Sequence, residues 1–145
     1  MPDDARATGG CLCGAVRYEV RGPLRDVLTC HCAECRRWSG HFFAASSARR
    51  EHLVLVEQRG LRWIQSPASD SAARRGFCGE CGSSLFWDAP DRETVSIAAG
   101  SVDEPTELRS IGHVYVVQTG DYYELPDDGL PRFPRLSGSP ADPAA

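Results

Sequence analysis

Short runs in which hydrophobic and polar residues alternate fill most of the chain, and this alternation is the period of a β-strand. Val16, Tyr18 and Val20 are separated by charged residues, and Gly22 with Pro23 then predicts a turn. Further strands are predicted at 42–45, 53–56, 61–64, 85–87, 95–98 and 114–117. Regular short strands with frequent turns favour an antiparallel sandwich or barrel-like sheet.

Helical periodicity is weak throughout, so we expect at most a turn or two of helix after Cys35 and near 48–52. The length predicts one domain, which we assign to residues 1–125. Residues 126–145, and especially 137–145, are rich in Pro, Gly, Ser and Ala and resemble a flexible C-terminal tail. The predicted fold class is therefore mainly β, with little helix.

Charge and hydropathy exclude several classes of partner. The net charge of −4 and the pI near 5.5 offer no electrostatic footprint for a nucleic-acid backbone. No stretch approaches the roughly 20 apolar residues of a membrane span. Residues 1–10 are polar and acidic, without the apolar centre of a signal peptide. We therefore expect a cytoplasmic protein that binds neither nucleic acid nor membrane.

Seven cysteines form three tight clusters, at 11–13, 30–35 and 78–81. In a reducing compartment, clustered cysteines bind metal or react more often than they cross-link, and an odd number cannot pair completely within one chain. A structural zinc site takes four protein ligands, whereas a catalytic one keeps three and leaves a position open. Seven thiols thus predict one complete and one open zinc site, and two ions per chain.

Two pairs complement each other as ligands of the complete site. Cys11 and Cys13 would lie on one face of a strand, because residues i and i+2 point the same way. Cys78 and Cys81 have the spacing of a knuckle turn, and Gly82 lets the backbone fold tightly beneath the metal. An ion shared by both pairs would tie the first strand to the middle of the chain.

The spacing predicts that three thiolates can converge on one ion in the remaining segment, which holds Cys30, Cys32 and Cys35. A fourth protein ligand is not obvious, since His31 on a strand would point away from the face of its cysteine neighbours. As distal ligands, His41, His52 and His113 remain alternatives to their more common structural role. Glu34 is either an acid or base near the metal or a solvated carboxylate.

The ligand set restricts the chemistry of the open site. Three thiolates leave zinc formally at −1, which weakens its Lewis acidity but allows an added thiol to bind as thiolate. Zinc deaminases can also use three cysteines, but they carry an H-x-E and a P-C-x-x-C signature. Here Phe77 precedes Cys78 and no His-x-Glu is present, so deamination is discounted.

Three motifs in this order resemble the signatures of the glutathione-dependent formaldehyde-activating enzyme family, which includes centromere protein V relatives. They are GCLCGAVRY at 10–18, CHCAECRR with Ser39 and Gly40 at 30–40, and FCGECGSSL at 77–85. A late His-aromatic strand at 113–116 is similar as well. The resemblance implies an Mss4-like β fold, a structural zinc on Cys11, Cys13, Cys78 and Cys81, and a catalytic zinc on Cys30, Cys32 and Cys35.

The activity that the resemblance implies is a carbon–sulfur lyase reaction that joins glutathione and formaldehyde as S-hydroxymethylglutathione. Arg36 and Arg37 follow the third ligand, so one of them is a candidate partner for a glutathione carboxylate, with a solvated turn as the alternative. Aromatic residues that either wall the site or pack the core are Trp38, Phe42, Phe43 and Trp87.

Two other functions remain open at this point. A non-enzymatic zinc module that binds a protein partner is one, since fold does not determine function. A redox switch at Cys30, Cys32 and Cys35 is the other, because exposed thiolates of low pKa oxidise readily.

Overall fold

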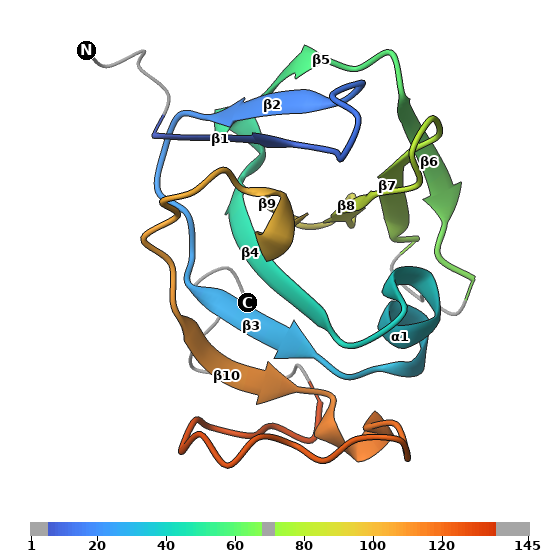
Figure 1. Ribbon diagram of the computed structural model, residues 1–145, viewed down its shortest axis with the longest axis vertical. Helices are drawn as coiled ribbons and strands as arrows, with labels where there is room; N and C mark the ends of the chain where they lie inside the picture. The colour runs from blue at the N-terminus through green and yellow to red at the C-terminus, as the bar shows by residue number, and fades with distance from the viewer. Residues whose placement is uncertain (1–5, 68–71, 136–145) are drawn as a thin grey trace.

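The computed structural model describes residues 6–67 and 72–135, which form two β-sheets (Figure 1). The smaller sheet has the strand order β1-β2-β5 and the larger has the order β10-β3-β4-β9-β8-β7-β6. The strands are β1 (Ala7–Gly10), β2 (Arg17–Val20), β3 (Val27–Cys30), β4 (Phe43–Arg49), β5 (Leu53–Glu57), β6 (Leu61–Gln65), β7 (Arg74–Cys78), β8 (Ser84–Asp88), β9 (Thr94–Ala98) and β10 (Ser110–Val114). The mainly β prediction is confirmed.

Helical segments are short. The α-helix α1 spans Ala33–Ser39, and one-turn 3-10 helices lie at η1 (Arg50–His52), η2 (Ala99–Ser101) and η3 (Val116–Gln118). The predicted helix near 48–52 is thus η1, while α1 begins two residues before Cys35 rather than after it. Within the described residues, no helix is long and apolar enough to cross a membrane.

Strand pairing is antiparallel except between β10 and β3, which run parallel. The strand predicted at 114–117 lies earlier, because Tyr115 takes a left-handed backbone conformation with φ of 56° and ends β10 at Val114. On the open side of β10, the N–H of His113 donates to the carbonyl of Pro131, and the N–H of Phe133 donates to the carbonyl of His113. Part of the predicted tail therefore covers the edge of this sheet; residues 136–145 lie outside the described part.

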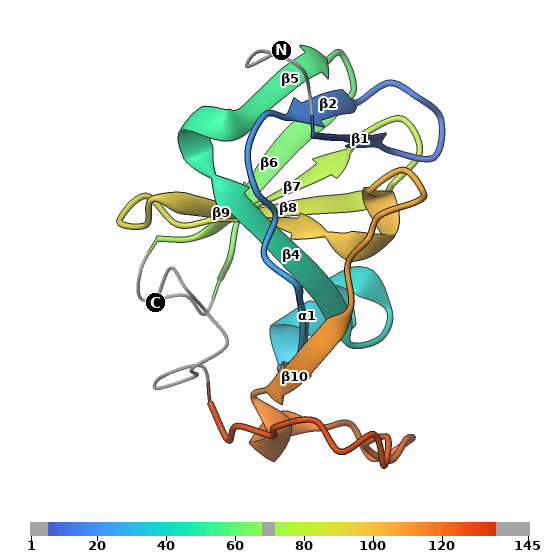
Figure 2. The same ribbon diagram turned by 90° about the vertical axis from the view of Figure 1, so that its left-hand side faces the viewer.

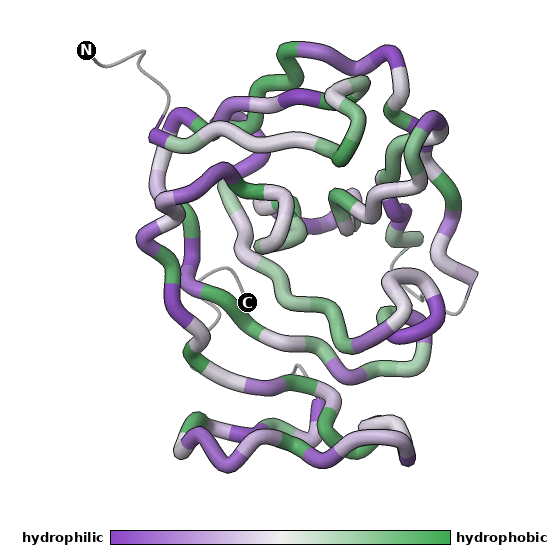
Figure 3. Tube along the Cα trace, viewed as in Figure 1, coloured by the Kyte–Doolittle hydropathy of each residue, from purple (hydrophilic) through white to green (hydrophobic). Residues whose placement is uncertain are grey.

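Strand β4 links the larger sheet to the smaller one. Figure 2 shows it running from the region of α1 toward the smaller sheet, where η1 leads into β5. In Figure 3 the loop at 103–107, between η2 and β10, is largely hydrophilic, whereas the end of β4 near α1 is largely apolar.

Two hydrophobic clusters fill the interior. The larger joins both sheets through residues such as Tyr18, Leu85 and Ile97, and it includes Cys11 and Cys78. The smaller one lies beside α1 and is built from Cys35, Phe43, Ala45 and Ala98, with Cys30, Cys32 and Trp38 packed against it. Each cysteine cluster thus rests on its own core.

Candidate metal centres

Four cysteine sulfurs meet where the β1–β2 connection approaches the end of β7. Those of Cys11, Cys13, Cys78 and Cys81 lie within 4.8 Å of one another. The Sγ of Cys13 is 3.8 Å from that of Cys11 and 3.9 Å from that of Cys78. Tetrahedral zinc with bonds of about 2.3 Å requires sulfurs about 3.8 Å apart, so this donor set fits the ion.

The first pair of this cluster is built by a turn, not by the strand that its i, i+2 spacing predicts. β1 ends at Gly10 and β2 starts at Arg17, and Gly14 has φ of +85°. The chain therefore reverses between the two strands, with the N–H of Cys11 donating to the carbonyl of Val16 at 3.0 Å. A tight reversal brings the two sulfurs together more directly than an extended segment would.

The second pair follows the predicted knuckle. β7 ends at Cys78, Gly82 takes φ of +82°, and its N–H donates to the carbonyl of Cys78 at 2.7 Å. The hydroxyl of Ser83 accepts a hydrogen bond from Leu12 N–H at 3.0 Å and lies 3.2 Å from the Sγ of Cys81. Donation from that hydroxyl lowers the pKa of Cys81 to about 5. Ser83 thereby joins the two ligand turns.

The other cysteine cluster lies where β3 meets α1. Cys30 ends the strand, Cys32 caps the helix and Cys35 lies in its first turn, with all three sulfurs within 4.8 Å of one another. Hydrogen bonds from the Cys30 and Cys35 thiols lower the pKa of Cys32 to about 2, and the contact with Cys32 raises the pKa of Cys30 well above its usual value. The three neighbouring thiols thus favour ionisation of Cys32 over that of Cys30, and a divalent cation would allow all three to ionise.

No histidine joins this cluster among the residues that the structure describes. His31 is fully buried on another side, with Nδ1 2.6 Å from the hydroxyl of Tyr123 and Nε2 3.0 Å from Nδ1 of His113. Nε2 of His113 is 2.9 Å from the carboxylate of Asp128. Burial lowers the pKa of His31 to about 4, so it is neutral and holds the chain between Cys30 and Cys32 in place.

The other two histidine alternatives lie apart from the cysteines as well. Nδ1 of His41 is 2.8 Å from the hydroxyl of Tyr122, and Nδ1 of His52 is buried without a hydrogen-bond partner. His52 lies close to Gly22, where a Cβ would be 2.0 Å from its ring.

Of the four aromatic candidates, Trp38 and Phe43 border the three-cysteine cluster, with ring centroids 5.3 Å apart. Phe42 packs on His31 instead, and Trp87 lies near the guanidinium of Arg92. Neither belongs to the hydrophobic residues that pack with Cys30, Cys32 and Cys35.

The arginines beside the cluster differ from the sequence expectation. The guanidinium of Arg36 donates to the backbone carbonyls of His31 and Gln118, at 3.3 and 3.0 Å, while Arg37 is exposed. Arg75, which the sequence did not single out, is buried with Nη1 3.8 Å from the Sγ of Cys35. No sequence signal marks Arg75, because its partners come from segments that are distant along the chain.

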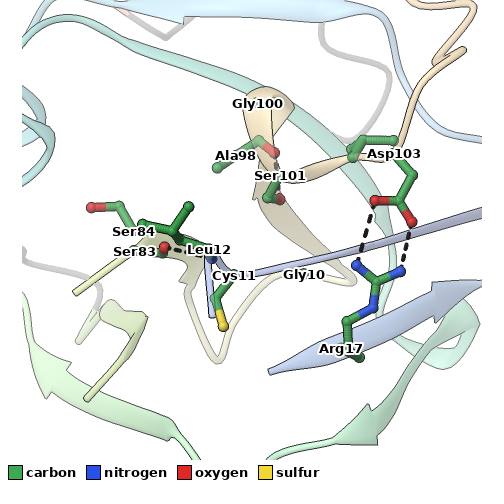
Figure 4. Close-up of a pocket in the computed structure, with 11 residues that line it drawn as sticks. Gly10, Cys11, Leu12, Arg17, Ser83, Ser84, Ala98, Gly100, Ser101 and Asp103 are labelled. Carbon is green, nitrogen blue, oxygen red and sulfur yellow. Dashed lines mark hydrogen bonds and ion pairs between the residues drawn. The ribbon is translucent and has the colours of Figure 1, made fainter. Parts of the chain in front are cut away.

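A shallow cleft of about 450 Å³ lies between the four-cysteine cluster and η2 (Figure 4). An ion pair between Arg17 and Asp103, with a shortest distance of 2.6 Å, lines one side, and Leu12 lines the cleft while 88% exposed. The cleft reaches Ala98, which packs with Cys35 in the smaller core.

Comparison with known proteins assigns the family. The chain is 32% identical over 79 residues to a protein of Schizosaccharomyces pombe named as an uncharacterised lyase; the match covers 54% of this chain and about half (55%) of that protein. A crystal structure of a Rhodobacter sphaeroides protein superposes with a TM-score of 0.56 and 26% identity, over 71% of this chain and 98% of the other.

The family model described as glutathione-dependent formaldehyde-activating enzyme matches residues 6–118, which is well over half of the chain and includes all seven cysteines. This chain therefore belongs to the glutathione-dependent formaldehyde-activating enzyme family.

Proposed function

We propose that this chain is a zinc-dependent carbon–sulfur lyase that acts on a thiol adduct. The adduct is S-hydroxymethylglutathione, which the enzyme forms from glutathione and formaldehyde in the condensing direction. The three-cysteine cluster carries the proposal, because it offers three sulfurs to one ion and, among the described residues, no fourth side-chain ligand. Family membership and the lyase-named relative support the same class of reaction.

In this proposal Cys11, Cys13, Cys78 and Cys81 hold a structural zinc, and Cys30, Cys32 and Cys35 hold the catalytic one. When bound there, zinc supplies an open position that favours the thiolate form of an incoming thiol. We also propose a cytoplasmic location, because a reducing compartment keeps the seven cysteines as free thiols.

Residues around the three-cysteine cluster hold its sulfurs together and are placed to contact the substrate. β3 and α1 hold the three sulfurs together over a core that includes the buried Phe43, and the partly buried Trp38 supplies an apolar border on which substrate carbon can pack. Arg37 is the exposed member of the arginine pair and the better placed to meet a substrate carboxylate. In the reaction the thiolate sulfur bonds to the aldehyde carbon, the carbonyl π bond opens, and the proton that the thiol released ends on the new hydroxyl.

Cobalt substitution tests the thiol part of this proposal. Addition of glutathione to the cobalt protein should change the sulfur-to-cobalt charge-transfer band, and Cys35→Ser should abolish that change. Exchange NMR should then show formaldehyde, glutathione and their adduct interconverting faster than the measured spontaneous background. Thiol binding without acceleration would reject formaldehyde as the partner, and no binding of any small thiol would favour a non-enzymatic module.

A further inference from the structure

Arg75 is a buried cation next to the three-cysteine cluster. It lies on β7, is 4% exposed, and its Nη1 is 3.8 Å from the Sγ of Cys35. Its guanidinium carbon is also 5.1 Å from the centroid of the Trp38 ring. A charge removed from water at this depth is costly unless partners compensate for it.

The partners of Arg75 orient its guanidinium. Nε donates to the hydroxyl of Ser66 at 3.1 Å, and Nη2 donates to Oε1 of Glu34 at 3.3 Å. The Ser66 hydroxyl also donates to the same carboxylate oxygen. One edge of the guanidinium is thus held by Ser66 and Glu34, which leaves Nη1 directed at Cys35.

The strand period explains why Arg75 reaches this cluster while a neighbouring residue serves the other one. Side chains alternate across β7, so Cys78 lies on the opposite face from Arg75. Cys78 belongs to the larger core and to the four-cysteine cluster, whereas Arg75 contacts Cys35 in the smaller core. The same strand therefore supplies a ligand to one site and a cation to the other.

Charge counting shows what a cation can do at the three-cysteine site. Three thiolates with a divalent ion sum to −1, and a substrate thiolate beside them brings the sum to −2. The three sulfurs lie within 4.8 Å of one another, and negative charges this close repel strongly in a partly desolvated site. A fixed guanidinium beside Cys35 offsets one of these charges, and a hydrogen bond from a charged donor is among the stronger kinds.

We propose that Arg75 is a positioning residue of the three-cysteine site: it holds Cys35 through Nη1 and offsets the negative charge of the thiolates around a divalent cation. Glu34 and Ser66 act through Arg75, because their side chains fix the orientation of its guanidinium. This inference rests on the proposed function, in which the cluster binds metal.

Graded chelation of the two-zinc full chain should remove the more weakly bound ion while the fold is kept, and refilling that site with cobalt against a competing chelator measures its affinity. The chelator concentration that removes the other ion measures the tighter site. Arg75→Met should lower the affinity for the more weakly bound ion by about 10-fold or more, because substitution of residues that support metal ligands commonly has an effect of this size. The same variant should weaken thiol binding, seen as a higher glutathione concentration at half-change of the charge-transfer band. Arg75→Lys keeps a positive charge and should recover part of both losses.

Arg74→Met is the matched control, because Arg74 is the adjacent residue of β7, on the other face, with its guanidinium 3.9 Å from the Trp63 ring. Arg74→Met should bind the more weakly bound ion, here called the second ion, with the same affinity as wild type. Equal affinity of Arg75→Met and wild type for the second ion would overturn the inference, as would equal weakening of both ions or no recovery in Arg75→Lys. Wild type that binds one ion only would instead overturn the proposed function itself, and the inference with it.

Discussion

At the scale of single residues, buried polar side chains find partners that are distant in sequence. Tyr18 is 1% exposed, and its hydroxyl is 2.7 Å from that of Ser101. Burial raises the pKa of Tyr18 to about 12, because an anionic phenolate would lose its hydration in the core. The neutral form is therefore part of the folded state.

This shift predicts a pH dependence of stability. The folded protein binds the Tyr18 proton more tightly than the unfolded chain, so the stabilisation is complete below about pH 10 and is lost as pH rises toward 12. Tyr18→Phe should be about 1 kcal/mol less stable than wild type at pH 8, because the hydrogen bond is missing. Urea denaturation at pH 8, 10 and 11 should show this difference shrinking with pH; a constant difference would contradict the assignment.

At the scale of elements, the turn after β7 places Cys78 and Cys81 of the four-cysteine cluster. Gly82 has φ of +82°, and a Cβ built on it would meet no atom within 4 Å. The demand at this position is therefore one of backbone conformation and not of space.

Two substitutions at Gly82 separate these demands. Gly82→Ala should lower the free energy of unfolding by about 1–2 kcal/mol, because alanine disfavours the left-handed region. Gly82→Asn should cost less, since asparagine visits that region more readily. Thermal or urea melts of the metal-loaded proteins measure both. Equal losses of unfolding free energy in the two variants would mean that the added side chain, and not the positive φ at residue 82, is the cause.

Strands with one buried face could be predicted from sequence, and others could not. In β2 the predicted alternation is observed, with Tyr18 and Val20 buried between more exposed charged residues. β1, β3 and β7 were missed: β1 ends in two glycines, β3 is buried at three successive positions, and β7 buries an arginine beside a glycine. Their burial depends on contacts with other strands, which alternation along one segment cannot reveal.

The same division applies to the candidate sites. Cysteine spacing predicted both clusters: Cys30, Cys32 and Cys35 lie close enough in sequence to converge locally, and the two remaining short-spaced pairs together supply four ligands. Arg75 could not be predicted, because its partners Glu34, Ser66 and Cys35 come from separate segments that meet only in the folded sheet. His31 was expected to point away from its cysteine neighbours, but its partners Tyr123 and His113 were not foreseen.

At the scale of the whole molecule, the two cysteine clusters differ in what they hold together. The four-cysteine cluster joins the β1–β2 turn to the end of β7 and includes residues of the larger core, whereas the three-cysteine cluster is confined to β3 and α1. Loss of the first would therefore separate segments distant in sequence, and loss of the second would affect one short segment.

Substitution should separate these roles. A structural zinc site can contribute about 10–16 kcal/mol of binding free energy, comparable with the roughly 5–15 kcal/mol stability of a domain. Cys81→Ser should therefore give poorly folded protein, whereas Cys35→Ser should stay folded and lose thiol-dependent chemistry. Circular dichroism melts and the exchange assay measure the two outcomes, and the reverse pattern would mean that the roles of the clusters are exchanged.

Metal analysis during graded chelation tests whether this chain holds one closed and one open metal site. Purified wild-type protein should contain two zinc ions per chain. One should leave at low chelator concentration while the fold is kept, because three protein ligands hold metal less completely than four, and the other should leave only as the chain unfolds. Simultaneous loss of both ions, or a folded protein that contains neither, would contradict the account.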